Sequence, residues 1–160
     1  MSAALALAAR VVVAGTFVVA ALQKLRALSV LRAQIEAFGV PGPLVGASVA
    51  LLPVAELATA SALVAVPGSS VPALAAIALL GAFTGVVVAN LLHGRNPPCP
   101  CFGAATSDAP ISPRTLVRNG WLLALAVVAT GSVDGADALL TLVLFVALGA
   151  VTAWLVALLR

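Results

Sequence analysis

The chain has very few charged residues. Only 8% of its 160 residues are Asp, Glu, Lys or Arg, whereas 63% are hydrophobic. A soluble globular domain carries about 25% charged residues, so this shortage excludes an ordinary soluble domain. The basic residues are scattered and lack interleaved aromatic residues, which argues against a nucleic-acid-binding protein. The composition therefore indicates a protein embedded in a lipid bilayer.

Residues that bind metals or exchange electrons are equally scarce. The chain has a single histidine, His93, and only two cysteines, Cys99 and Cys101. Two sulfurs and one imidazole would hold a soft metal ion only weakly or transiently. We therefore predict no resident metal site.

Long apolar runs dominate the rest of the chain. Five stretches are long enough, or nearly so, to cross a membrane. They are residues 5–23, 44–66, 71–92, 115–131 and 138–159. The first is interpreted as a retained helix, not a cleaved signal peptide, because Arg10 interrupts its apolar run. We predict an all-α, multi-pass bundle forming one integral-membrane domain over residues 1–160, in the cytoplasmic (inner) membrane.

Residues 27–38 differ from the apolar spans. Leu31 and Ile35 lie on one face at helical spacing, while Arg32 and Glu36 occupy the other face at i, i+4. This pattern predicts a short helix that follows the first span and lies in the membrane interface.

The basic residues gather on one side of the predicted topology, whereas the opposite loops carry only Asp134 and Asp137. By the positive-inside rule, the basic side faces the cytoplasm and the N-terminus lies outside. The loop over residues 93–113, which contains both cysteines, belongs to the basic side. The basic residues concerned are Lys24, Arg26, Arg32, Arg95, Arg114 and Arg118.

The two cysteines, separated only by Pro100, are typical of a redox pair. Thiol–disulfide exchange needs an accessible thiolate and a second thiol to resolve the mixed disulfide. A ring closed between residues i and i+2 is tight, and a strained, exposed disulfide exchanges readily. Arg95 and Arg118 are the candidate groups that favour the thiolate. We predict Cys99 and Cys101 as the catalytic residues.

Glu56 lies near the middle of the second span, where a charged group is costly and is normally paired or functional. Arg10 of the first span is its expected partner, and Lys24 is expected to extend toward the interface. Asn90 and His93, one turn apart, are expected to continue this polar network toward the cysteines. Two interpretations stay open: an ion pair that holds the bundle together, or a centre for proton or electron transfer.

Several separated motifs occur in an order that is similar to one family. In this order they resemble the methylamine-utilisation MauE family, within the wider DoxX-like group, over about residues 10–120. The motifs are Arg10 with Lys24-Leu25, Phe38–Pro43, Leu52–Leu57, Cys99–Gly103 and Arg118-Asn119. Pro100 departs from the pattern, because glycine is common between the two cysteines.

The resemblance implies a four-helix core similar to the bundle of vitamin K epoxide reductase-type proteins, with the fifth helix outside the motifs. It further implies a redox role in disulfide formation of exported proteins, with a thioredoxin-like partner. Because this chain has one cysteine pair, its electrons must pass to that partner, to a quinone, or to both. Such a role requires an external cysteine loop, in conflict with the charge distribution, and both orientations stay open.

We therefore predict a membrane thiol–disulfide oxidoreductase. Cys99 and Cys101 exchange electrons, His93, Arg95, Arg118 and Asn119 support them, and Arg10, Lys24, Glu56 and Asn90 form an intramembrane polar centre suited to a quinone. One alternative is a non-enzymatic membrane subunit, or a protein that binds or transports soft metals such as copper or mercury through the Cys-Pro-Cys loop. Another is a small-solute transporter built around Glu56.

Overall fold

The computed structural model describes residues 3–66, 69–95, 97 and 110–131. All regular elements within these residues are helices, which confirms the predicted all-helical class for this part of the chain. The helices are α1 (Ala3–Arg26), α2 (Leu28–Ala37), α3 (Gly42–Ala65), α4 (Val71–Leu92) and α5 (Pro113–Val128). The predicted fifth transmembrane helix, residues 138–159, and both cysteines lie outside the described residues.

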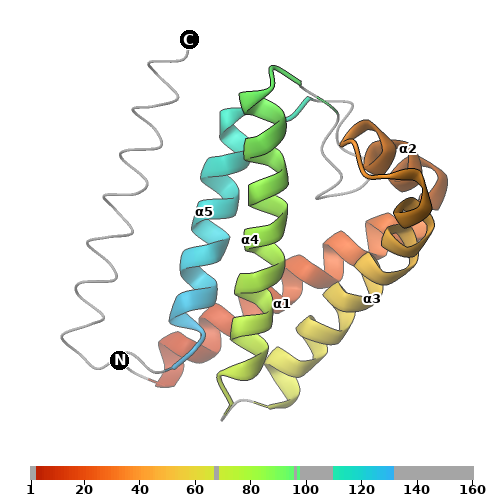
Figure 1. Ribbon diagram of the computed structural model, residues 1–160. Coiled ribbons are helices and arrows are strands. Elements are labelled where there is room, and N and C mark those ends of the chain that lie inside the picture. The colour runs from red at the N-terminus through yellow and green to blue at the C-terminus, as the bar shows by residue number, and fades with distance from the viewer. Residues whose placement is uncertain (1–2, 67–68, 96, 98–109, 132–160) are drawn as a thin grey trace.

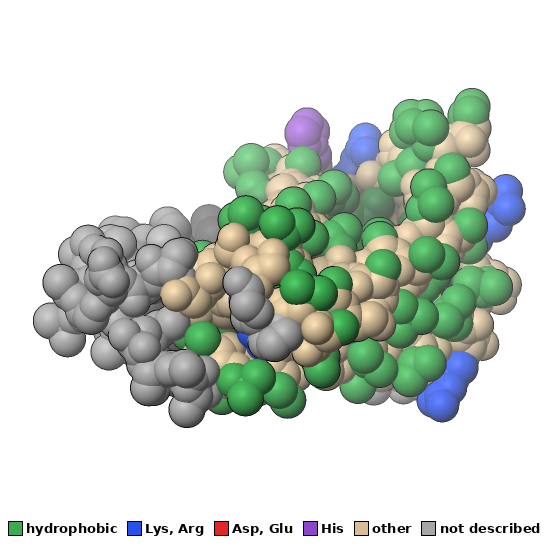
Figure 2. All heavy atoms as spheres, turned by 90° about the horizontal axis from the view of Figure 1, so that it is seen from below, with side chains coloured by type: hydrophobic (Ala, Val, Ile, Leu, Met, Phe, Trp, Pro, Cys, Tyr) green, Lys and Arg blue, Asp and Glu red, His purple; other side chains and the backbone are tan. Residues whose placement is uncertain are grey.

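Three of these helices are long and apolar enough to cross a membrane. They cover Leu5–Arg26, Gly42–Ala65 and Val71–Leu92, with mean hydropathies of 2.2, 1.7 and 2.3. Many large apolar side chains point outward from them, and Figure 2 shows a face on which hydrophobic side chains predominate over charged ones. In water such a surface would be costly, whereas lipid tails solvate it. The chain is therefore a multi-pass membrane protein.

The fourth predicted span differs in length. Residues 115–131 were expected to cross the membrane, but α5 has 16 residues and ends at Val128. A span needs about 20 residues at 1.5 Å per residue. The predicted helix is present, and it is shorter than a full crossing.

Proline and glycine set the helix limits. Pro43, Pro72 and Pro113 stand in the first turns of α3, α4 and α5, where the missing N–H has no intrahelical acceptor. Gly39 follows α2 with φ +80°, and Gly94 follows α4 with φ +67°. This left-handed conformation is unfavourable for residues with a Cβ atom, so glycine allows the chain to reverse there.

The helices pack as two pairs, α1 with α3 and α4 with α5, and the two pairs are inclined to each other. Figure 1 shows α4 beside α5, with α1 and α3 inclined across them. α1 packs most extensively against α3, and it also contacts α5, while α3 contacts α4. The main core lies among these four helices, and its buried members are Ala9, Val13, Ala14, Phe17, Ala60, Leu63, Ala73, Ala76, Leu80, Ala126 and Ala129.

The short helix α2 is amphipathic, as predicted. Leu31 and Ile35 are buried and pack with Val45 of α3. On the opposite face the Nε atom of Arg32 lies 3.2 Å from Oε1 of Glu36, and both side chains are exposed. Its location along the membrane interface stays a prediction.

Candidate functional site

A buried ion pair joins α1 to α3. The Nζ atom of Lys24 lies 2.6 Å from Oε1 of Glu56, and each side chain is 1% exposed. The ring of Phe83 on α4 adds a cation–π contact, with its centroid 5.7 Å from Nζ. Three helices therefore meet around one ammonium group.

This pairing corrects two predictions. Arg10 was expected to pair with Glu56, and Lys24 was expected to extend to the interface. Instead Lys24 points into the bundle, because α1 runs antiparallel to α3 with an offset that brings its last turn beside the middle of α3. Arg10 contacts Val66, at the far end of α3, through a hydrogen bond.

The environment of Glu56 leaves one oxygen without a partner among the described residues. Its Oε1 atom accepts the hydrogen bond from Lys24, whereas Oε2 is buried and accepts no hydrogen bond from any residue that the structure describes. A buried carboxylate oxygen without a donor is costly, so this atom is the part of the pair best suited to accept a proton or a hydrogen bond from a ligand.

Arg10 binds backbone carbonyls at the carboxyl ends of α3 and α5 and in the turn before α4. Its Nε atom donates to the Ala129 carbonyl at 2.9 Å, Nη1 to the Val66 carbonyl at 3.0 Å and Nη2 to the Ser69 carbonyl at 2.7 Å. The last carbonyls of a helix lack intrahelical donors and carry the negative end of the helix dipole. Among the described residues, backbone carbonyls alone thus provide hydrogen-bond acceptors to all three nitrogens of this buried guanidinium.

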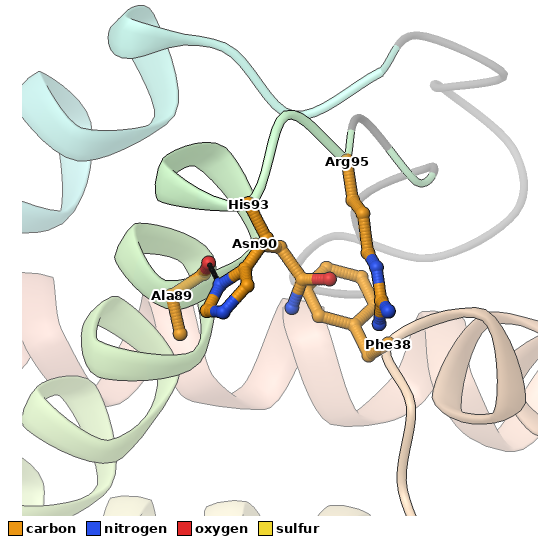
Figure 3. Close-up of a pocket in the computed structure, with 5 residues that line it drawn as sticks. All are labelled: Phe38, Ala89, Asn90, His93 and Arg95. Atoms are coloured by element: carbon orange, nitrogen blue, oxygen red, sulfur yellow. Dashed lines mark hydrogen bonds between the residues drawn. The ribbon is translucent and has the colours of Figure 1, made fainter.

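Asn90 and His93 lie at the end of α4, apart from the ion pair. The Nδ2 atom of Asn90 donates to the Val86 carbonyl at 3.0 Å, and Nδ1 of His93 lies 2.6 Å from the Ala89 carbonyl. Within the described residues, no hydrogen bond connects either side chain to the Lys24–Glu56 pair. Both line a cavity together with Phe38, Ala89 and Arg95 (Figure 3).

Asn119 connects α5 to α4. It is 2% exposed, and its Nδ2 atom donates to Oγ1 of Thr84 at 3.3 Å. Thr84 donates in turn to the Leu80 carbonyl at 2.7 Å. Arg118 precedes Asn119 in the sequence and belongs to the same predicted thiolate-supporting group, and its side chain is partly buried.

Both cysteines lie outside the described residues, but the base of their loop is described. The N–H of Ile111 donates to the Pro97 carbonyl at 2.9 Å, so the two arms of the loop meet beside the end of α4. Ile111 is buried against Val87, and Phe38 packs on the same small cluster. The loop that carries the cysteines therefore begins and ends next to the cavity.

Two residues at the site were missed by the sequence analysis. Phe83 contacts the ammonium of Lys24, and Thr84 bonds Asn119. The sequence alone could have indicated Thr84, because it is a polar residue in an otherwise apolar span. Phe83 has none, because a phenylalanine in such a span is ordinary. The described residues contain no group of three His, Cys, Asp or Glu side chains placed to hold a metal ion.

The apolar helices and the charged pair buried between them define an α-helical multi-pass membrane protein with an intramembrane polar centre. Comparison with known proteins narrows this class. The family model described as methylamine utilisation protein MauE matches residues 2–132, and the chain belongs to this family.

A curated relative supports the same assignment. The methylamine utilization protein MauE of Paracoccus denitrificans is 39% identical over 137 residues, which cover 84% of this chain and 73% of that protein. No solved structure gives a significant match. The family resemblance identified from the sequence motifs is thereby confirmed.

Proposed function

We propose that this chain is a membrane thiol–disulfide oxidoreductase that acts in methylamine utilisation. The observation that carries the proposal is that a MauE-family membrane protein keeps only two cysteines and spaces them two residues apart. Both belong to a loop whose arms are joined at the Ile111–Pro97 hydrogen bond. A loop whose arms are joined at a helix end is a suitable place for a strained, reactive disulfide.

The reaction is a two-electron exchange. A thiolate of a thioredoxin-like partner attacks one sulfur of the Cys99–Cys101 disulfide, and the other sulfur leaves as a thiolate. The second partner thiol then attacks the mixed disulfide, which leaves the partner oxidised and this pair reduced, with two electrons and two protons transferred. The reverse sequence oxidises the pair, and a quinone that becomes a quinol can also accept its electrons.

The same proposal assigns roles to the charged and polar residues around the cysteine pair and inside the bundle. Arg95 and Arg118 stabilise a thiolate by their positive charge, with His93 and Asn119 nearby in sequence. The Lys24–Glu56 pair is the polar centre available to a quinone or to protons, since Oε2 of Glu56 accepts no hydrogen bond from a described residue. Arg10 has no part in this centre, because its guanidinium binds three backbone carbonyls.

The architecture proposed for this function is a single membrane domain. α1, α3, α4 and α5 form its four-helix core, residues 138–159 add a further membrane helix, and α2 lies along the interface. The inner membrane is the proposed location, because quinones and exported thiol proteins meet there.

The test compares cysteine variants of the purified full chain with a control in the same loop. Cys99→Ser and Cys101→Ser are each expected to abolish disulfide exchange with purified thioredoxin, whereas Ala104→Ser retains it. Full exchange by either cysteine variant would refute the proposal. Stoichiometric binding of Cu(I) or Hg(II) by a pair that does not cycle would instead favour a metal-binding subunit.

A second experiment determines the side of the membrane. Intact cells are treated with a membrane-impermeant maleimide, with and without prior mild reduction, and the protein mass is measured. A two-adduct shift that appears only after reduction is the expected result for an external disulfide. Labelling only after the membrane is opened would put the pair inside, as the charge distribution predicts.

A further inference from the structure

A cavity of about 210 Å³ lies between the end of α4 and the turn after α2 (Figure 3). Phe38 and Ala89 provide apolar wall, and Asn90, His93 and Arg95 provide polar groups. In Figure 3 the side chain of Arg95 extends toward Phe38. The cavity therefore combines one apolar side with one positively charged group.

Arg95 has no counter-charge among the described residues. The acidic residues that the structure describes are Glu36 and Glu56, and these pair with Arg32 and Lys24. The guanidinium of Arg95 makes no hydrogen bond or ion pair with a described residue. Arginine binds carboxylate and phosphate through paired, charge-assisted hydrogen bonds, so this group suits an anionic ligand, and the membrane surroundings of the cavity favour a phosphate.

The other two polar groups favour a ligand that also carries hydroxyl groups. Nδ2 of Asn90 already donates to the Val86 carbonyl, and its Oδ1 atom is an acceptor. A carbonyl oxygen only accepts, so Nδ1 of His93, which lies 2.6 Å from the Ala89 carbonyl, is the donor, and in that tautomer Nε2 is an acceptor. Arg95 can donate hydrogen bonds to a phosphate, and Asn90 and His93 beside it can accept hydrogen bonds from hydroxyl groups. This combination matches a phosphodiester with a hydroxylated headgroup.

The surroundings of the cavity favour a lipid over a free phosphate ester. α4 is a candidate membrane span, so its end lies near headgroup level. Leu92, next to His93, is 81% exposed and offers an apolar surface to acyl chains. Arg26 at the end of α1 and Arg114 in the first turn of α5 are exposed basic residues, and basic pockets between membrane helices attract anionic headgroups.

We propose that this cavity binds the headgroup of an anionic phospholipid of the phosphatidylglycerol type. Arg95 binds the phosphate, Asn90 and His93 accept hydrogen bonds from the glycerol hydroxyls, and Phe38 and Ala89 contact the apolar part of the lipid. The site goes beyond the proposed thiol chemistry. It shares Arg95 and His93 with the residues proposed to support the thiolate, but lipid binding itself requires no thiol exchange.

The test counts lipids bound to the delipidated full chain in detergent by native mass spectrometry. Three lipids with the same acyl chains are titrated: phosphatidylglycerol, phosphatidylmethanol and phosphatidylcholine. Phosphatidylglycerol is expected to bind about tenfold more tightly than phosphatidylcholine, the effect of one charge-assisted contact. Phosphatidylmethanol, which has the charge without the hydroxyls, is expected to bind about threefold more weakly than phosphatidylglycerol.

Two variants locate the site. Arg95→Gln is expected to remove the preference for phosphatidylglycerol, whereas Arg32→Gln, which changes an exposed arginine of α2 that pairs with Glu36, is expected to change the affinity by less than about twofold. Unchanged binding by Arg95→Gln, or an equal loss in both variants, would overturn the proposal. Soluble glycerol phosphate that displaces the lipid at equal concentration would also overturn it, because the ligand would then be the free anion.

Discussion

Replacing Glu56 with alanine removes the carboxylate that pairs with the Lys24 ammonium inside the bundle. At 2.6 Å and an effective dielectric constant of about 20, the Coulomb attraction between these two charges is about 6 kcal/mol. Desolvation offsets part of this attraction, and removing one partner of a buried pair costs about 3–5 kcal/mol. We expect Glu56→Ala to lower the free energy of unfolding by about 4 kcal/mol.

The chain contains its own control. Arg32 and Glu36 form an exposed i, i+4 pair, whose side chains are 60% and 54% exposed. Such a pair contributes only about 0.3–0.5 kcal/mol, because water and salt screen it. Glu36→Ala is therefore expected to be nearly silent, although it removes the same chemical group.

The assay is equilibrium unfolding in mixed micelles of a mild detergent and dodecyl sulfate, followed by circular dichroism. The double variant Lys24→Met, Glu56→Met is expected to recover most of the loss, because it leaves no buried charge unpaired. A Glu56→Ala variant as stable as Glu36→Ala, or a double variant as unstable as Glu56→Ala, would contradict this role of the buried pair. A stable double variant that no longer exchanges disulfides would assign the pair to the redox function.

Three further predictions use the same unfolding assay. Arg10→Met is expected to lower the free energy of unfolding by about 3 kcal/mol, because three carbonyls lose a charged donor. Arg10→Lys is expected to restore only part of this stability, because one ammonium group cannot reach all three carbonyls. Thr84→Val is expected to cost about 1 kcal/mol by removing the acceptor of Asn119, and in the Asn119→Leu background its cost should largely disappear. Gly39→Ala is expected to cost about 1 kcal/mol because its φ is +80°, whereas Gly42→Ala, at the helical start of α3 with open space around it, should be neutral or stabilising.

The helices themselves were largely predictable from the sequence. The apolar runs at 44–66 and 71–92 correspond to α3 (Gly42–Ala65) and α4 (Val71–Leu92). The pattern at 27–38 correctly predicted an amphipathic helix, since burial of one face needs only the 3.6-residue period. The first span extends three residues beyond its predicted end at residue 23, because Lys24 and Arg26 are compatible with a helix even though they end the apolar run.

The candidate site was only partly predictable. Glu56 was correctly singled out as a residue that needs a partner, because a charge in mid-span is costly wherever the helices pack. The choice between Arg10 and Lys24 was wrong, since the two lie 14 positions apart on α1, about 21 Å along the helix axis. No local pattern encodes which of them lies level with Glu56.

By itself, the sequence determined that this protein is helical and membrane-embedded, and its ordered motifs identified the MauE family. The helical, membrane-embedded character follows from composition and periodicity, whereas the family follows from the resemblance of the motifs; all of these are local features of the sequence. Only the tertiary structure decided that Lys24 pairs with Glu56, that Arg10 binds helix ends, and that Arg95 lies over a cavity with Phe38. The reason is physical: these contacts depend on the axial offset and crossing of packed helices, which emerge when many apolar side chains interlock at once.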